Sequence, residues 1–381
     1  MKFKIKQSDF SKALILSNKS LLSRANLPIL TNVFISSLPS GKIEVISTNL
    51  ETATKVTVDC AVEKEGKITI PGRALQEFVS QLPEGDIEFE KLGEEVIVST
   101  GGFSARFATL SAEDFPAIPK IDKGDKFLVL PTELAKGILR VAFCAAQDEG
   151  RPVLTGVLCE FGSGAISMVA TDGYRLSFQK VQIKSNGGSA VKINLPAKAL
   201  LEVAKIIVEA EEVSKQEPVQ ITVADNLNQA DFKIGSVEFT SRLIEGEFPN
   251  WQKIIPLEFT SKAKILKEEL MRLIKVASIF ARDSGNIIRL RFESEGKGTA
   301  NLKIFASDNQ LGSNEARCDV ELSGKGGEIA FNFRYLLEML SSVEGEEVNF
   351  EMIESLNPGR LTMADSKDDY FHIIMPVRLQ S

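Results

Sequence analysis

Six cations recur along this chain at two fixed sets of spacings. Positions 12, 136 and 272 are separated by 124 and 136 residues, and positions 73, 198 and 334 by 125 and 136 residues. The residues are Lys12, Lys136, Arg272, Arg73, Lys198 and Arg334. Cations gathered on one surface bind phosphate groups without reading a base sequence. The pattern therefore predicts repeated phosphate contacts. The alternative is that Lys and Arg, 45 of 381 residues, are simply common on exposed helices.

These spacings come from a triplication of the whole chain. PILTNVF at 28–34 recurs as PVLTGVL at 152–158, and ISTNLE at 46–51 recurs as VATDGY at 169–174 and FASDNQ at 305–310. The period is far longer than the 20–50 residues of solenoid repeats, so each unit is long enough to bury its own core. We predict three domains, at residues 1–121, 122–256 and 257–381.

The same secondary-structure elements must position the repeated cations in each unit. An alternating strand opens the unit, a first helix follows, and a second helix is expected to begin after Pro71, Pro196 or Asn332. Short alternating strands make up the rest, so the fold class is α+β: three tandem copies of a two-helix plus antiparallel-sheet domain. Three further cations on the first helices, Lys19, Arg140 and Lys275, and Arg24 in a loop, are expected to add to the positive surface.

Residues suited to enzymatic chemistry are scarce. The only histidine, His372, lies in the apolar stretch YFHIIM and is expected to pack at the surface. Asp172 could be a catalytic carboxylate, but the repeat aligns it with Asn49 and Asp308, which suits a turn residue better. No phosphate loop or G-x-S-x-G elbow is present. We therefore predict a protein that is not an enzyme, with no catalytic residue, no metal site and no cofactor.

The composition narrows the possible class of protein further. Four cysteines without paired or metal-type spacing indicate reduced, buried thiols: Cys60, Cys144, Cys159 and Cys318. The start of the chain has no apolar signal segment, and no apolar run is long enough to span a membrane, so a cytoplasmic location without a membrane partner is expected. The net charge of −7 argues against a conventional nucleic-acid-binding domain, unless the cations are concentrated on the helices as the repeat indicates.

Three segments resemble one family closely. VATDGYRLS at 169–177, LPILTN at 27–32 and IIMPVRL at 373–379 are similar to the bacterial DNA polymerase III beta subunits, the sliding clamps. The resemblance covers the whole chain. It implies a head-to-tail homodimer whose six domains form a ring around double-stranded DNA, with helices inside and sheets outside. It also retains Arg151 as a DNA-contact candidate beside the repeated cations and Arg24.

The resemblance implies two protein-binding regions. The subunit interface would join an edge strand, with Phe103, Ala105 and Phe107, to the end of a helix with Ile279 and Phe280. A peptide pocket would lie between domains 2 and 3. Its candidate residues are Leu154, Thr171, Gly173, Tyr174, Arg175, Leu176, Pro249, Ile254, Met375, Pro376, Val377, Arg378 and Leu379. An apolar cleft with a methionine wall suits short peptides containing Leu and Phe.

The implied partners follow from that ring and pocket. They are the replicative DNA polymerase alpha subunit, a clamp loader, and other polymerases and repair factors that present such peptides. Two alternatives are weighed against this function. Without the resemblance, Met375–Leu379 would simply be the last core strand. The whole chain could also be a repeat scaffold that binds only proteins, with its cations solvated.

Overall fold

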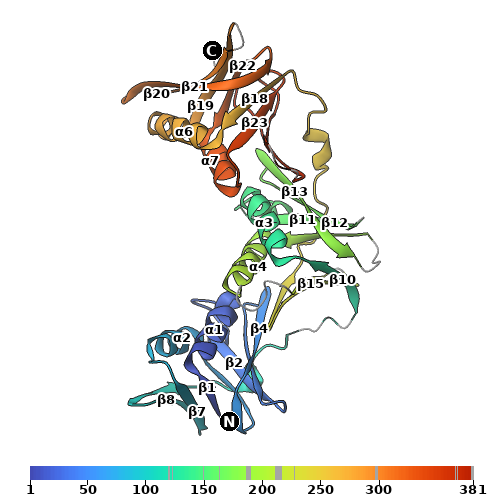
Figure 1. Ribbon diagram of the computed structural model, residues 1–381. Helices are drawn as coiled ribbons and strands as arrows, with labels where there is room; N and C mark the ends of the chain where they lie inside the picture. The colour runs from blue at the N-terminus through green and yellow to red at the C-terminus, as the bar shows by residue number, and fades with distance from the viewer. Residues whose placement is uncertain are drawn as a thin grey trace.

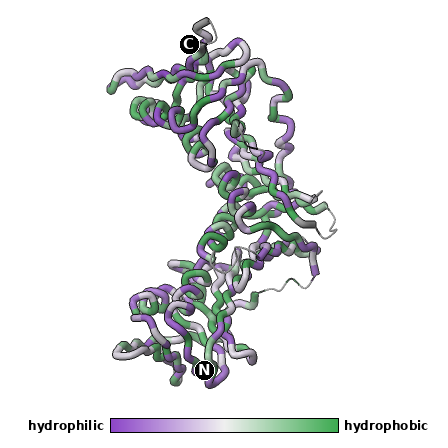
Figure 2. The backbone as a smooth tube through the Cα atoms, in the orientation of Figure 1, coloured by the Kyte–Doolittle hydropathy of each residue, from purple (hydrophilic) through white to green (hydrophobic). Residues whose placement is uncertain are grey.

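The computed structural model describes residues 1–118, 121, 123–148, 150–162, 164–185, 190–210, 217–226, 228–296, 299–364, 366 and 368–378. Three α+β domains follow one another in an open crescent, and the helices lie along its concave side (Figure 1). In Figure 2 hydrophobic and hydrophilic residues are interspersed along the helices and the strands that they cover. No helix among the described residues is long and apolar enough to cross a membrane.

Domain 1 contains two helices and strands that pair antiparallel. Its elements are β1 Lys2–Lys6, α1 Gln7–Ser17, β2 Asn32–Leu38, β3 Lys42–Thr48, β4 Thr52–Asp59, β5 Ala61–Lys64, β6 Lys67–Pro71, α2 Gly72–Gln81, β7 Asp86–Leu92, β8 Glu95–Thr100 and β9 Phe103–Ala108. Three rings, Phe3, Phe10 and Phe89, meet in its core, where Phe3 and Phe89 stack at 4.5 Å between centroids. The three rings thereby join strand β1, helix α1 and strand β7.

Domain 2 repeats the same order. Its elements are β10 Gly124–Val129, α3 Pro131–Val141, β11 Gly156–Gly162, β12 Ala165–Thr171, β13 Arg175–Ser185, β14 Val191–Pro196, α4 Ala197–Glu209, β15 Val219–Ala224, β16 Gln229–Ile234 and β17 Val237–Arg242.

Domain 3 repeats this order of elements again. Its elements are β18 Ser261–Leu266, α6 Lys267–Ala281, β19 Ile287–Gly296, β20 Thr299–Asp308, β21 Gly312–Gly324, β22 Gly327–Asn332, α7 Phe333–Ser342, β23 Glu347–Met352, β24 Gly359–Met363 and β25 Tyr370–Ile374. The second helices begin directly after Pro71, Pro196 and Asn332, which confirms the prediction.

The domains are joined by strand pairing. Strand β17 pairs antiparallel with β4, which we name seam 1–2, and β25 pairs antiparallel with β13, which we name seam 2–3. Each seam joins the last strand of one domain to the corresponding strand of the domain before it. The sheets therefore continue across both boundaries.

A carboxylate beside seam 1–2 provides a pH prediction. Burial, reinforced by Glu238, raises the pKa of Asp231 to about 6, although its oxygen accepts a hydrogen bond from Thr240 at 2.9 Å. The folded state therefore binds more protons than the unfolded state between about pH 4 and pH 6, and stability falls as the pH rises through that window. Asp231→Asn keeps the acceptor and removes the titration. We expect it to raise the free energy of unfolding at pH 7 by up to about 3 kcal/mol, and by almost nothing at pH 4.

Thermal midpoints measured at pH 4 and pH 7 check this expectation. Asp225→Asn, which changes an exposed carboxylate in the same domain, is the matched control. A gain for Asp231→Asn that is equal at both pH values would contradict the assignment.

Candidate functional site

Seam 2–3 contains an apolar cluster. The rings of Phe178 and Phe371 stack across the seam with centroids 4.8 Å apart, and the ring of Trp251, in the short turn Trp251–Ile254, lies 5.4 Å from that of Phe178. Phe178 and Trp251 are buried, and Phe371 packs against them. The buried cluster also includes Leu154, Leu158, Val169, Leu176, Phe248 and Ile373. The cluster is separate from the three domain cores and combines residues of domains 2 and 3.

Seam 1–2 is different at the equivalent place. The strand registers align Phe178 with Lys55 and Phe371 with Glu238, and these two form an ion pair across β4 and β17. A charged pair at this position leaves no apolar surface for a ligand. Among the described residues, the triplicated fold therefore places an apolar cluster at seam 2–3 and an ion pair at the equivalent place of seam 1–2.

The turn between β12 and β13 borders this site, and it is built as an Asx turn. Oδ1 of Asp172 accepts hydrogen bonds from the backbone N–H groups of Tyr174 at 2.9 Å and Arg175 at 3.1 Å. Asn49 and Asp308 make the same pair of bonds in domains 1 and 3. The prediction that Asp172 is a turn residue is confirmed. Gly173 occupies the left-handed region at φ +93°, where a side chain would be strained.

The pocket candidates fall into three groups around this turn. Leu154, Thr171 and Leu176 are buried. Exposed candidates are Tyr174, Pro249, Ile254, Met375 and Arg378, with Gly173 also at the surface and Pro376 and Val377 partly covered. The backbone N–H of Met375 donates to the carbonyl of Tyr174 at 2.8 Å, and that of Val377 to Ala330 at 2.8 Å, so the C-terminal segment lies against both domains. Leu379 lies outside the described residues.

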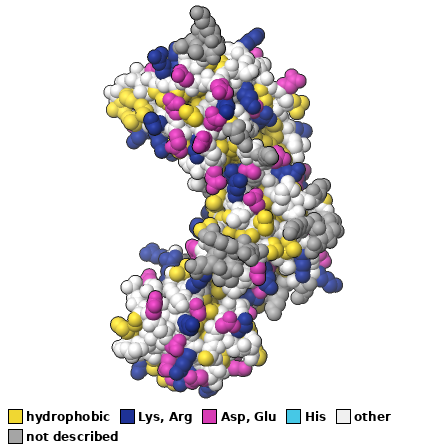
Figure 3. Space-filling model, in the orientation of Figure 1, with side chains coloured by type: hydrophobic (Ala, Val, Ile, Leu, Met, Phe, Trp, Pro, Cys, Tyr) yellow, Lys and Arg dark blue, Asp and Glu magenta, His cyan; other side chains and the backbone are white. Residues whose placement is uncertain are grey.

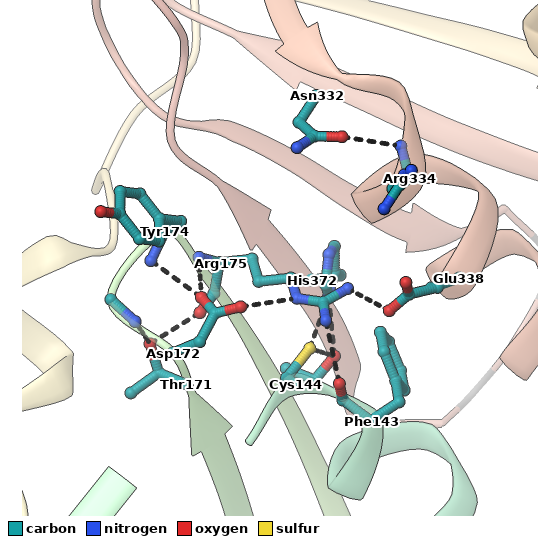
Figure 4. Close-up of polar contacts among 12 residues, drawn as sticks. Phe143, Cys144, Thr171, Asp172, Tyr174, Arg175, Asn332, Arg334, Glu338 and His372 are labelled. Atoms are coloured by element: carbon teal, nitrogen blue, oxygen red, sulfur yellow. Dashed lines mark hydrogen bonds and ion pairs between the residues drawn. The ribbon is translucent and has the colours of Figure 1, made fainter. Parts of the chain in front are cut away.

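Arg175 is the candidate whose side chain does not face the site. Only 7% of the residue is exposed, and its guanidinium is held inside seam 2–3 by Asp172, Glu338 and the carbonyl of Phe143 (Figure 4). Arg151, predicted as a DNA contact, is exposed and donates to the carbonyl of Asp172 at 3.1 Å. The structure therefore brings Arg151 to the Asp172–Tyr174 turn, among the peptide-site candidates.

His372 does not pack at the surface, and that expectation is wrong. It is fully buried, because the seam makes β25 an interior strand between β13 and β24. Its Nδ1 lies 2.7 Å from Oγ of Ser177 and 3.7 Å from Sγ of Cys144. Burial lowers the pKa of His372 to about 3 and raises that of Cys144 to about 12, so the pair is a neutral imidazole and a thiol. This contact has no activated nucleophile, which fits a packing role.

The repeated cations are placed unevenly. Arg73, Lys198, Arg272 and Arg334 are exposed on the helices, as is Arg24 in its loop. Lys12 is partly buried and makes contacts of its own. Lys136 forms an ion pair with Asp368 of domain 3 at 2.8 Å. Lys and Arg are interspersed with Asp and Glu on the face drawn in Figure 3, so that face has no large patch of a single sign.

Two of the additional cations are not part of a positive surface. Arg140 is 2% exposed and binds Gln179 and Asp368, so its prediction as a surface charge is wrong. Lys19 pairs with Glu209 of domain 2 at 2.6 Å. Both cations face a domain boundary, where an acidic partner neutralises them. Lys275 is exposed.

The predicted edge strand is exposed at the end of domain 1. Among the described residues, β9 pairs along its length with β8 alone. Phe103 is 54% exposed, whereas Ala105 and Phe107 are partly covered. The ring of Phe107 contacts that of Phe78 on α2, with 5.8 Å between the ring centroids. At the far end of the crescent, Ile279 is 47% exposed and Phe280 is partly buried. Hydrophobic side chains are visible at this end of domain 3 in Figure 3.

Sequence reasoning missed the aromatic residues of the cluster at seam 2–3. Phe178, Phe371 and Trp251 contact one another there, and none of them is among the candidate site residues of the sequence analysis. One signal was present in the repeat. Phe178 of domain 2 aligns with Lys55 of domain 1, and Phe371 of domain 3 aligns with Glu238 of domain 2, so the repeat replaces a charged pair by an aromatic one.

The triplicated fold and its strand-joined seams define the class of three-domain DNA clamps. Models of the DNA polymerase III beta subunit match consecutive parts of the chain: the N-terminal domain at residues 1–119, the central domain at 129–250 and the C-terminal domain at 252–378. The chain belongs to the DNA polymerase III beta subunit family, and it is a sliding clamp of DNA polymerase III.

Individual relatives agree along the full length. The beta sliding clamp of Synechocystis sp. is 29% identical over 400 residues, covering 100% of both chains. That of Chlamydia muridarum is 28% identical over 380 residues, covering 100% of this chain and 99% of its own. The crystal structure of the DNA polymerase III subunit beta from Pseudomonas aeruginosa superposes with a TM-score of 0.91 at 27% identity, covering 100% of both chains. Clamps are non-catalytic processivity factors, which confirms that the chain is not an enzyme.

Proposed function

We propose that two copies of this chain close head to tail into a ring that encircles duplex DNA. The ring would tether the replicative polymerase and other factors through the apolar site at seam 2–3. The observation that supports closure best is a pair of matching edges. Strand β9 ends domain 1 as β17 and β25 end domains 2 and 3, and the first half of β21 corresponds to β4 and β13. Those two edges are the ones that each internal seam joins.

The internal seams predict the register of the closing one. The two equivalent pairs within the chain are Phe239–Thr54 in seam 1–2 and His372–Ser177 in seam 2–3. Following the antiparallel pairings through each domain aligns Ala105 with Phe239 and His372, and Asn314 with Thr54 and Ser177. We therefore pair Ala105 of one copy with Asn314 of the other. A contact that repeats the two internal ones would turn in the same sense, and a head-to-tail contact whose rotation closes makes a ring.

The faces of these edges are complementary in that register. Phe103 would lie over Ala316, and Phe107 over Gly312, on the face toward the helices. The other face would bring Arg106 diagonally opposite Glu315. Alternate residues of a strand point to opposite faces, so this pairing buries the aromatic face and leaves the charged one in water. Ile279 and Phe280 would pack under the new seam, as Phe143 and Cys144 pack under seam 2–3.

The positions of the exposed cations support the DNA-facing role of the helices. Arg73, Lys198 and Arg334 are each the second residue of their helix. A cation there is unfavourable for the helix, because the N-terminal end of the helix dipole is positive. A phosphate placed at this end would be attracted by both the dipole and the side chain. Weak contacts of this kind, without base contacts, allow movement along DNA.

The partners follow from ring and pocket together. The alpha subunit of the replicative polymerase, other polymerases and repair factors would each insert a short Leu/Phe-containing peptide between the TDGYR turn and the Met375–Arg378 segment. A closed ring also needs a clamp loader to open it. These partners place the ring in the cytoplasm with the chromosome. The domain boundaries 1–121, 122–256 and 257–381 remain our proposal for this architecture.

Retention on circular DNA tests encirclement. After loading by an ATP-driven clamp loader, we expect the protein to stay on nicked circular DNA through gel filtration in high salt, and to leave when the DNA is linearised. The reason is topological: screened phosphate contacts cannot hold it, but a closed ring has no exit. Equal retention on both forms would contradict encirclement and favour a scaffold that binds only proteins.

A further inference from the structure

Arg175 is a buried cation whose bonds cross the boundary between domains 2 and 3. It belongs to β13, and its Nη1 donates to Oε2 of Glu338 on α7 at 2.6 Å. Its Nη2 donates to the carbonyl of Phe143 at 3.0 Å, and its guanidinium lies 4.5 Å from the centre of the Tyr335 ring. Figure 4 shows the side chain directed toward α7 and away from Tyr174. A charge buried in this way is stable only while its partners are in place.

The same guanidinium also fixes the turn that borders the peptide site. Its Nε donates to Oδ2 of Asp172 at 3.0 Å, while Oδ1 of Asp172 holds the N–H groups of Tyr174 and Arg175. One carboxylate therefore joins the turn to Arg175, and Arg175 joins it to α7. The position of the Asp172–Tyr174 turn is thereby set by domain 3, which also supplies the opposite wall, Met375–Arg378.

This connection is absent from the equivalent place in domains 1 and 3. The helix glutamate is repeated, as Glu77, Glu202 and Glu338, with offsets of 125 and 136 residues. The arginine is not repeated, because the hairpin registers align Arg175 with Thr52 and Gly312. The buried arginine thus occurs at the seam that has the apolar surface.

We infer that Arg175 and Glu338 are positioning residues for the peptide site: they hold its turn at a fixed distance from the C-terminal wall without touching the peptide. This inference rests on the proposed peptide function of seam 2–3. If the turn is free to move, only part of the molecules has a competent site, so the association rate falls while the dissociation rate changes little. Loss of a direct contact would instead raise the dissociation rate.

The test compares peptide kinetics in Glu338→Gln and Arg175→Met. The probe is a fluorescein-labelled synthetic peptide ending in Leu-Phe, and rates are measured by stopped-flow anisotropy. We expect about tenfold weaker binding for Glu338→Gln, equal to about 1.4 kcal/mol, with the loss in the association rate. The double variant should bind no more weakly than Arg175→Met alone, because both changes break one ion pair. Glu338 is half-exposed, so its substitution leaves a foldable protein if Arg175→Met does not fold.

Two controls separate positioning from general damage. Glu344→Gln removes the same charge from an exposed site in domain 3 and should bind as the unchanged chain does. The emission of Trp251, the single tryptophan, reports the packing of the seam and should not move. Unaltered association rates in Glu338→Gln, or a loss accompanied by shifted emission, would overturn the inference. Failure of the unchanged chain to bind the peptide would overturn the proposed function instead.

Discussion

A chain with Phe107→Asp and Ile279→Asp is expected to sediment as a monomer of 41.7 kDa, whereas the unchanged chain is expected to sediment at twice that mass. Both side chains lie on the apolar face of the proposed closing seam, at opposite ends of the crescent. Each carboxylate would be buried there without a cation, at a cost of about 2 kcal/mol or more. A ring of two copies has two such seams and therefore four such costs, about 8 kcal/mol in all, which raise the dimer dissociation constant by about a millionfold.

Leu356→Asp is the matched control, because Leu356 is an exposed apolar residue outside both edges. Sedimentation velocity at micromolar concentration distinguishes the two masses. An unshifted dimer peak for the double variant would reject the interface. The monomer should also lose its retention on circular DNA, since a single crescent cannot close.

The register itself has a positive test in the same interface. In the two internal seams the pairs Glu51–Arg242 and Tyr174–Met375, three residues along the strands from Thr54–Phe239 and Ser177–His372, are hydrogen-bonded. The pairs equivalent to Ala105 and Asn314 are therefore of the non-hydrogen-bonded kind, with Cα atoms about 4.5 Å apart. That spacing suits a disulfide. Ala105→Cys with Asn314→Cys should crosslink on oxidation, whereas Ala105→Cys with Glu315→Cys should not, because those side chains point to opposite faces.

The repeat predicted more of this molecule than composition did. It located the starts of the second helices, the turn role of Asp172 and the exposed cations Arg73, Lys198, Arg272 and Arg334. These features are local, and each domain builds them from its own residues. The sequence could not show that Arg140 and Lys136 share one carboxylate, because Asp368 is distant along the chain and belongs to another domain.

The error at His372 has the same physical origin. An alternating strand at the end of a chain is expected to be an edge, where a polar residue meets water. Seam pairing with β13 instead covers both sides of β25 and buries the ring. The stacked pair of Phe178 and Phe371 was missed for the same reason, since their contact exists only once two domains join. Sequence periodicity reports the environment within a domain, and the proposed peptide site lies between domains.

Deleting Met375–Ser381 is expected to abolish binding of the Leu/Phe-containing peptide while the dimer remains intact. The deletion removes one wall of the site, including the exposed Met375, and the bonds from Met375 to Tyr174 and from Val377 to Ala330. An adaptable methionine surface next to buried Leu154 and Leu176 is what an apolar peptide side chain would fill. We expect the affinity to fall by at least about a hundredfold, equal to about 2.7 kcal/mol.

Titration calorimetry measures that loss, and sedimentation of the same sample provides its control. Strand β25 ends at Ile374, so all its pairings with β13 remain after the deletion, and the edges β9 and β21 belong to other ends of the crescent. A truncated chain that stays dimeric and keeps its Trp251 emission has therefore lost the wall and not the seam. Unchanged peptide affinity in that chain would refute the pocket. Lost affinity together with a monomer peak would show that the segment supports the fold, as the last core strand would.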